Sequence, residues 1–273
     1  MKKSNIQKSG ICIFCNGARL TKQHVIPDWI SEYLVPAPHY QVITNPVLGI
    51  PIGEKTVIMD TGEPFVKSHN GTFGQFKIRN VCLNCNGGWI SQQEQRSIPF
   101  IGKMIRGEDL FIAKADARKI SVAIALMTMM NEFTDPNKSR RAIPGYHRRI
   151  LKNTLNVPPN WYIGVGVMAD DGIPRSRNHH MVTPHIMRYI ESPASFHINT
   201  IRLNRLIFQA VVLENFGYPV AFKNGQLKQI WPYIDCDQGW QSGLLPLTEK
   251  DFLKVSDDLN HSILMAGVSN FSG

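Results

Sequence analysis

The sequence predicts an α+β protein with a small, zinc-stapled N-terminal part and a larger α+β part built around one buried helix. Three observations favour this class: two Cys-x-x-Cys pairs near the N-terminus, a run over residues 114–133 that is apolar on nearly every face, and short β-prone segments after that run. Of the 273 residues, 43% are hydrophobic, which is enough for a real core. We place the boundary between the two parts after residue 98.

The N-terminal part is expected to alternate short strands and helices around a loop-rich insertion. Residues 35–75 are rich in Pro and Gly and hold brief β-prone runs, which is typical of hairpins and loops. Pro99 and Gly102 should end the last helix of this part. We expect strands at residues 25–26, 40–44, 56–59 and 76–81, and helices at residues 29–34, opened by Pro27-Asp28, and at residues 89–96.

The second part, residues 99–273, begins with the strongest helical segment of the chain. Residues 114–133 are apolar around the whole helix, which indicates burial, and their methionines are interpreted as packing residues. Residues 203–213 fit either a helix or a strand, and we favour a helix. Further strands are expected at residues 161–168, 180–189, 196–201 and 221–222.

Charge and targeting signals restrict the partners and the compartment. The formal net charge of +9 attracts polyanions, of which nucleic acid is the commonest, although a basic protein without such a partner is the alternative. No signal peptide is recognisable, and the longest apolar stretch, residues 122–130, is too short to span a bilayer. We therefore expect a cytoplasmic protein whose five cysteines stay reduced.

The paired cysteines predict a structural zinc site. Zinc takes four ligands in a tetrahedron, and each Cys-x-x-Cys turn presents two thiolates at one corner. Asn and Gly residues follow both pairs and permit the tight backbone of a zinc knuckle. Separate thiols or redox-active pairs are the alternatives, and Cys236 is interpreted as a packed thiol. The expected zinc ligands are Cys12, Cys15, Cys82 and Cys85.

Two polar residues beside the cysteine pairs make the pattern recognisable. His24 lies in Thr21-Lys-Gln-His-Val-Ile-Pro27, and Asn86 directly follows Cys85 in Cys85-Asn-Gly-Gly-Trp-Ile-Ser91. This pattern resembles HNH, or ββα-metal, endonucleases with a zinc site beside the active site. In those proteins Cys-x-x-Cys is followed by an acid-His-[Val/Ile]-Ile-Pro stretch and then by Cys-x-x-Cys-Asn. A mostly uncharacterised bacterial subgroup looks especially similar. The resemblance is specific over residues 12–91 and only suggestive beyond.

The resemblance implies a metal-dependent hydrolysis of phosphodiester bonds in DNA. His24, on a β-hairpin, would be the general base that takes a proton from water. Asn86, at the start of the following helix, would hold a divalent Mg²⁺ or Mn²⁺ ion through its side-chain oxygen. Residues 1–98 would form this HNH-type module. A packed or surface histidine and a capping asparagine are the plain structural alternatives.

Gln23 departs from the pattern. The family usually has Asp or Glu directly before the histidine as a second metal ligand, whereas an amide oxygen can coordinate only without charge. A catalytically weakened, zinc-dependent nucleic-acid-binding protein is therefore the alternative function, and a zinc-stapled interaction module without nucleic acid is a third. His69-Asn70 in the insertion could approach the metal, but we interpret it as a plain loop pair.

Two tracts without acidic residues are candidate contacts for nucleic-acid phosphates. They cover residues 138–152 and 173–190, and each can also be a solvated face. His179 and His180 are adjacent on an expected strand and so point to opposite faces, which argues against a shared metal. The nucleic-acid candidates are Arg140, Arg141, Arg148, Arg149 and Lys152.

Overall fold

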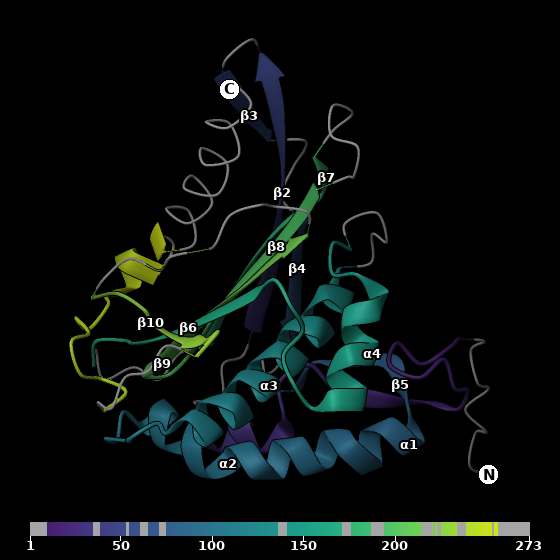
Figure 1. Cartoon of the computed structure of the whole chain (residues 1–273), viewed down its shortest axis with the longest axis horizontal. Helices are drawn as coiled ribbons and strands as arrows, with labels where there is room; N and C mark the ends of the chain where they lie inside the picture. Colours follow the sequence, from purple (N-terminus) through teal and green to yellow (C-terminus); the bar gives the residue numbers. More distant parts are fainter. Residues whose placement is uncertain are drawn as a thin grey trace.

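The chain folds into a large β-sheet, a layer of helices on one of its faces and a two-stranded ribbon beside the helices (Figure 1). The predicted α+β class is confirmed. The computed structural model describes residues 10–34, 39–52, 55–60, 65–70, 75–135, 141–170, 176–186, 194–214, 220, 222, 225–233, 239–252 and 254–255. Over residues 39–70 and 176–195 the description is of the backbone.

The two-stranded ribbon leads directly into a helix. β1 (Leu20–His24) pairs antiparallel with β5 (Lys77–Cys82). The chain then continues through α1 (Leu83–Cys85) and the π-helical turn η3 (Asn86–Ile90), which is kinked at Gly88 (φ −101°, ψ −111°), into α2 (Ser91–Arg106). The order along this unit is therefore strand, strand, helix. A 3-10 helix, η1 (Asp28–Tyr33), follows β1 and begins where the sequence predicts a helical stretch.

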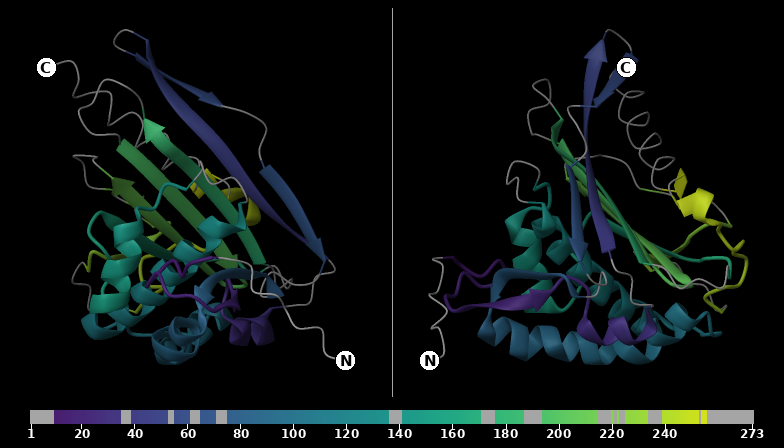
Figure 2. Two further views of the ribbon diagram at one scale, coloured as in Figure 1. Left: turned by 90° about the vertical axis from the view of Figure 1, so that its right-hand side faces the viewer. Right: turned by 180° about the vertical axis from the view of Figure 1, so that it is seen from behind.

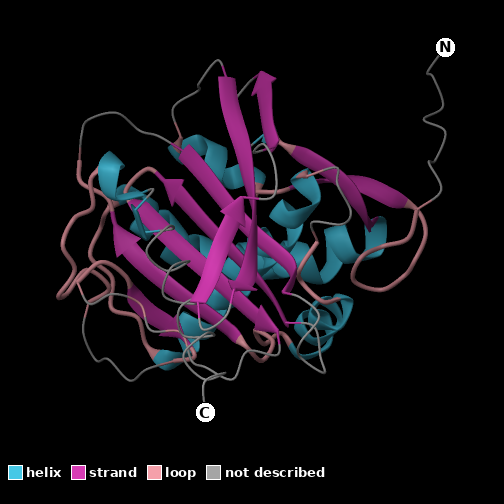
Figure 3. Ribbon diagram, turned by 90° about the horizontal axis from the view of Figure 1, so that it is seen from above, coloured by secondary structure: helices cyan, strands magenta, loops and turns pink. Residues whose placement is uncertain are grey.

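The large sheet has eight strands in the order β10-β6-β9-β8-β7-β2-β3, with β4 also paired to β2. All pairs are antiparallel except β2 with β7, which run parallel. Figure 3 shows these strands crossing in front of the helices. The strands are β2 (His39–Ile52), β3 (Lys55–Asp60), β4 (Phe65–Asn70), β6 (Trp161–Val167), β7 (Ser176–Ile186), β8 (Ala194–Leu203), β9 (Leu206–Glu214) and β10 (Lys228–Trp231).

The described parts of the expected insertion at residues 35–75, which are residues 39–52, 55–60 and 65–70, belong to this large sheet. Their strands form where the β-prone runs predict them, but β2 pairs with β7 from Ile43↔His179 to Pro46↔Val182. Figure 2 shows β2, β3 and β4 along one border of the sheet. The segment between the two cysteine pairs therefore extends the sheet of the second part instead of forming a separate appendage.

The buried helix is confirmed as α3 (Lys114–Asn131), and it lies between α2 and the sheet (Figure 2). Every residue from Ile120 to Asn131 is buried. The short η4 (Glu132–Thr134) and α4 (Gly145–Thr154) complete the helical layer. Packing on both sides explains the sequence, because a helix that touches neighbours all around needs apolar residues all around.

The expected helix end at Pro99 is wrong. α2 continues through Pro99 and Gly102 to Arg106 and ends at Gly107, whose φ of 73° is left-handed. Pro99 is exposed, as is Gln95, so water can reach the carbonyl that loses its helical donor. The boundary after residue 98 falls inside α2, and one apolar core joins side chains from before and after it.

The expected helix at residues 203–213 is also wrong, because this run forms strand β9. Phe208, Ala210 and Val212 face the helical layer, whereas Ile207 and Val211 pack in a second core on the opposite face of the sheet. A strand covered on both faces has no alternation between apolar and polar residues, so its pattern is easily mistaken for that of a buried helix. Two shorter expectations fail as well, since β1 ends before Val25 and Phe222 lies outside the strands.

Candidate metal centre

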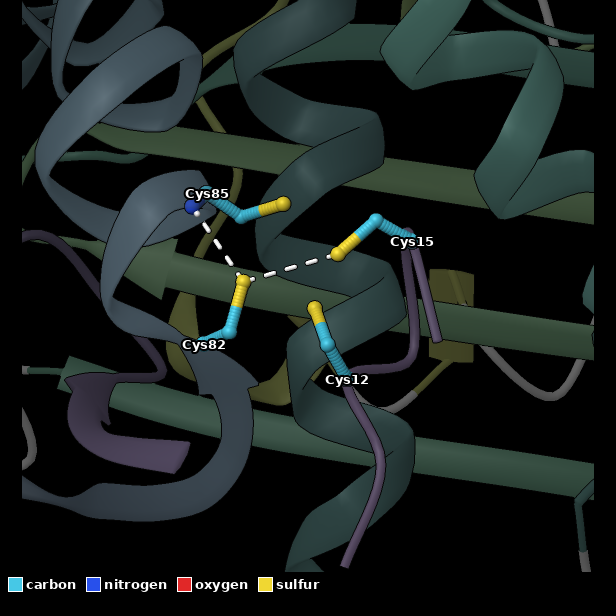
Figure 4. A group of neighbouring side chains, drawn as sticks. All are labelled: Cys12, Cys15, Cys82 and Cys85. Carbon is cyan, nitrogen blue, oxygen red and sulfur yellow. Dashed lines mark hydrogen bonds between the residues drawn. The ribbon is translucent and has the colours of Figure 1, made fainter. Parts of the chain in front are cut away.

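The four paired cysteines meet at one point. The sulfur atoms of Cys12, Cys15, Cys82 and Cys85 all lie within 4.8 Å of one another, and Cys15 Sγ is 3.5 Å from Cys82 Sγ (Figure 4). Zinc–sulfur bonds of ~2.3 Å in a tetrahedron place sulfur atoms about 3.8 Å apart. The four thiols therefore have the spacing that a zinc ion requires, as the sequence predicts.

Backbone turns hold the first knuckle in shape. Cys12 N–H donates to Gly17 O at 2.8 Å, and Asn16 N–H donates to Cys12 O at 2.9 Å, with Asn16 at a left-handed φ of 59°. Gly17 N–H donates to Cys15 Sγ at 3.3 Å. A Cβ atom on Gly17 would lie 3.1 Å from Cys15 Sγ, so the sulfur occupies the space of a side chain. Gly17 therefore allows the close approach of a ligand, and a larger residue there would press on the Cys15 sulfur.

The second knuckle opens the helix of the ribbon unit. Cys85 N–H donates to Cys82 Sγ at 3.4 Å, and Ile13 N–H donates to Asn80 O at 3.0 Å, which ties the two knuckles together. Trp89 packs edge-to-face on Phe14 with ring centroids 5.1 Å apart. The ring contact gives Trp89 of the motif a packing role.

The ionisation of the thiols also fits a cation. Burial raises the pKa of Cys85 and of Cys15, while Cys82, which accepts hydrogen bonds from its neighbours, has a pKa lowered to about 7. Without a cation, close and buried thiols cannot all ionise together. A Zn²⁺ ion would supply the missing positive charge and convert them to thiolate ligands.

His24 is the last residue of β1 and lies opposite Lys77 of β5. Its Nε2 atom is 3.2 Å from Oδ1 of Asp28, at the start of η1. Desolvation lowers the pKa of His24 from its ordinary value, and the charge of Lys77 lowers it further, while Asp28 raises it. The imidazole is therefore neutral near pH 7, with Nε2–H directed to Asp28 and Nδ1 left as the basic nitrogen.

Gln23 lies on the opposite side of β1 and is buried. Its side-chain Nε2 donates to Oε1 of Glu94 on α2 at 3.2 Å. Desolvation raises the pKa of Glu94 to about 7, the charge of Asp28 raises it further, and the bond from Gln23 lowers it. A carboxylate thus sits beside the position where the resemblance implies a missing acid. Sequence reasoning overlooked Glu94, although it follows Asn86 by about two helical turns.

Asn86 joins the start of the helix to the ribbon. Its Nδ2 donates to Oγ1 of Thr21 at 3.0 Å, and Thr21 Oγ1 donates to Val81 O at 3.2 Å. The structure therefore brings Asn86 against β1, the strand that carries Gln23 and His24. The amide oxygen of Asn86 takes no part in that bond.

The expected nucleic-acid tract at residues 138–152 is partly internal. Arg148 is buried and forms an ion pair with the buried Glu132, so it cannot face a polyanion. Arg141 stacks over Phe133, with its guanidinium carbon 4.4 Å from the ring centroid. Arg149 is exposed and Lys152 is half-buried. The run of basic residues alone does not show which of them is internal. One half of an amphipathic helix faces the core, and Arg148 lies on that half.

The remaining predicted positions either lie outside the described residues or lie on strands of the large sheet. Arg140 and Cys236 lie outside the described residues, and so do parts of the tract at 173–190. His179 and His180 lie on β7, a strand, as expected. His69 and Asn70 lie on β4, which is a strand and not the expected loop. In the part of the chain that the structure describes, no helix is long and apolar enough to cross a membrane.

Comparisons with known proteins place the chain in no family. No family model, no curated protein and no solved structure matches it.

Proposed function

We propose that this chain is a metal-dependent endonuclease that hydrolyses phosphodiester bonds in DNA with His24 as the general base. The observation that carries the proposal is the strand–strand–helix unit β1–β5–α2, closed at one end by the four cysteines. This unit places His24 at the end of β1, with Asp28 against its ring and Glu94 beside its neighbour Gln23.

The surroundings of His24 suit a general base. The Asp28 carboxylate accepts Nε2–H and so fixes the tautomer and the ring orientation. Nδ1 is then free to take the proton of a water molecule that attacks phosphorus, because burial keeps the imidazole neutral at pH 7. With a side-chain exposure of 18%, His24 is shielded but still reachable by a substrate.

Oxygen atoms on the same strand–strand–helix unit suit a hard divalent cation. Mg²⁺ or Mn²⁺ bound there would offset the charge that develops on the phosphate. The Glu94 carboxylate and the amide oxygens of Gln23 and Asn86 are the groups on this unit that would hold it. Glu94 provides the negative charge that Gln23 lacks, which supports activity despite the departure from the family pattern.

One contact favours a second candidate, a zinc-dependent nucleic-acid-binding protein with weakened catalysis. Gln23 donates a hydrogen bond to Glu94 and so partners that carboxylate without any cation. A binding site that is satisfied in this way binds a metal ion more weakly, because the ion must displace an existing hydrogen bond.

Cleavage of supercoiled plasmid DNA distinguishes the two candidates. Zinc-loaded protein should nick plasmid with Mg²⁺ or Mn²⁺ and not without them, and His24→Ala purified identically should be inactive. Lys250→Ala, at an exposed position remote in sequence from the ribbon, serves as the matched control and should cut normally. A His24→Ala protein as active as the wild type would exclude the proposed base.

A further inference from the structure

One face of the β1–β5 ribbon is cationic and holds His24. Lys22 and His24 are two residues apart on β1, so their side chains lie on the same face. Lys77 pairs directly with His24 across the ribbon and therefore shares that face. The neighbouring pair Gln23↔Ile78 is buried on the other face. Lys22 and Lys77 are exposed.

Arg79 extends this face, and Arg19 directly precedes β1. Arg79 follows Lys77 by two residues, at the start of the register shift, and is partly exposed. Arg19 is exposed in the turn before β1. Among the described residues, none of the four cations Arg19, Lys22, Lys77 and Arg79 forms an ion pair. Their charges are thus available to an external anion, unlike that of Arg148.

The two strands of the ribbon and their neighbouring residues carry no acidic side chain of their own. Residues 10–27 and 75–93 contain no Asp or Glu, and the acids that follow them are Asp28 and Glu94, which lie beside His24 and Gln23. A cationic strip that ends at a histidine paired with one carboxylate, Asp28, is the arrangement expected when phosphates are bound along the strip and one of them reaches the reactive end.

We propose that the ribbon face formed by Lys22, Lys77 and Arg79, together with Arg19 just before β1, binds the sugar-phosphate backbone of duplex DNA and delivers one phosphate to His24. The role of His24 in this inference rests on the proposed function. Residues two apart on a strand lie about 7 Å apart, so long side chains on both strands can contact several phosphates at once. The major groove of DNA is also wide enough to admit a two-stranded ribbon.

Equilibrium binding without a divalent cation tests this face independently of cleavage. The triple variant Lys22→Ala/Lys77→Ala/Arg79→Ala should bind a fluorescent DNA duplex at least ~10-fold more weakly than the wild type, and the slope of log Kd against log salt should fall by about three. The control Lys103→Ala/Lys250→Ala/Lys254→Ala removes the same charge at exposed sites and should change Kd little. Zinc content and circular dichroism verify that both variants fold.

The outcomes separate this inference from the proposed function. Equal losses in the two triple variants would show a general charge effect and overturn the inference, as would wild-type binding to polyglutamate as tight as to DNA. A wild-type protein that cuts DNA, with a ribbon variant that binds and cuts equally well, overturns the inference alone. Loss of binding in the ribbon variant of a protein that never cuts overturns the proposed function and leaves the DNA-binding face standing.

Discussion

The side-chain amide of Gln23 donates a hydrogen bond to the carboxylate of Glu94, 71 residues later in the chain. Gln23 is buried on β1 and Glu94 is on α2, so the bond joins the ribbon to the helix that follows it. The amide both partners the carboxylate and keeps a second negative charge out of a desolvated site. Replacements at these two positions therefore act on stability and on metal affinity in opposite directions.

Gln23→Glu should lower the Mg²⁺ concentration needed for cleavage, because it adds a charged oxygen ligand next to Glu94. Without Mg²⁺ the same variant should unfold at a lower temperature at pH 8, since two carboxylates then face each other in a buried site. Plasmid cleavage over a Mg²⁺ series and thermal unfolding with and without Mg²⁺ measure the two effects. If the variant cuts and the natural protein does not at any metal concentration, the natural chain is a DNA-binding protein with a decayed site.

Glu94→Gln should stabilise the protein at pH 8 but not at pH 5. The pKa of Glu94 in the folded protein is raised to about 7, so the folded state holds its proton more tightly than the unfolded state. The contribution of Glu94 to the free energy of unfolding is fully present below pH ~4.5, where the carboxyl is protonated in both states. It is lost as the pH rises through 7 and the carboxyl ionises in the folded protein. The variant should recover up to about 3 kcal/mol at pH 8. Urea unfolding in Mg²⁺-free buffer at both pH values measures this, and an equal effect at pH 5 would contradict it.

Zinc should be required for the fold of the ribbon unit. Purified protein should contain about one zinc per chain, and Cys82→Ser should unfold the unit. Gly17→Ala should lose zinc faster to a chelator than the wild type, because the added Cβ lies 3.1 Å from Cys15 Sγ. Gly87→Ala is a matched control, since a Cβ there has no neighbour within 4 Å. Zinc release is followed with a colorimetric chelator, and equal rates for both variants would show that Gly17 imposes no constraint.

The zinc ligands could be predicted from the sequence, because each Cys-x-x-Cys pair has the spacing that two zinc ligands on one turn require. Cys12 and Cys82 each begin one such pair, and the structure brings the two pairs together. The pairing of Gln23 with Glu94 could not be predicted, since it depends on how α2 lies against β1. The prediction of a helix at β9 fails for a related reason, because its two faces are covered by layers that the sequence of the strand does not reveal.

Arg148→Ala should destabilise the protein without weakening DNA binding at a temperature where it stays folded. The change leaves the buried carboxylate of Glu132 without its ion-pair partner, which costs about 3–5 kcal/mol. Arg149→Ala removes an exposed charge from the same helix and should change stability by less than about 0.5 kcal/mol. Denaturant unfolding and duplex binding of both variants measure this. Stability losses of equal size would remove the distinction between the two arginines.

The pH dependence of cleavage should report His24. Because burial lowers the pKa of His24 below its ordinary value of 6.5, the neutral base persists into mildly acidic solution. The acidic limb of the rate profile at saturating Mg²⁺ should therefore lie at lower pH than an ordinary histidine would give, as the imidazole gains a proton.

Asp28→Asn tests the tautomer assigned to that histidine. The Asp28 charge raises the pKa of His24, so removing it should move the acidic limb of the rate profile to still lower pH. The maximal rate should also fall, because an uncharged amide holds the Nε2–H of His24 less firmly and stabilises the imidazolium less. Asp109→Asn, an exposed acid elsewhere in the chain, should leave both the limb and the rate unchanged. A limb that moves to higher pH in Asp28→Asn would mean that Asp28 does not face the catalytic base, and the pairing at 3.2 Å would then play no part in the reaction.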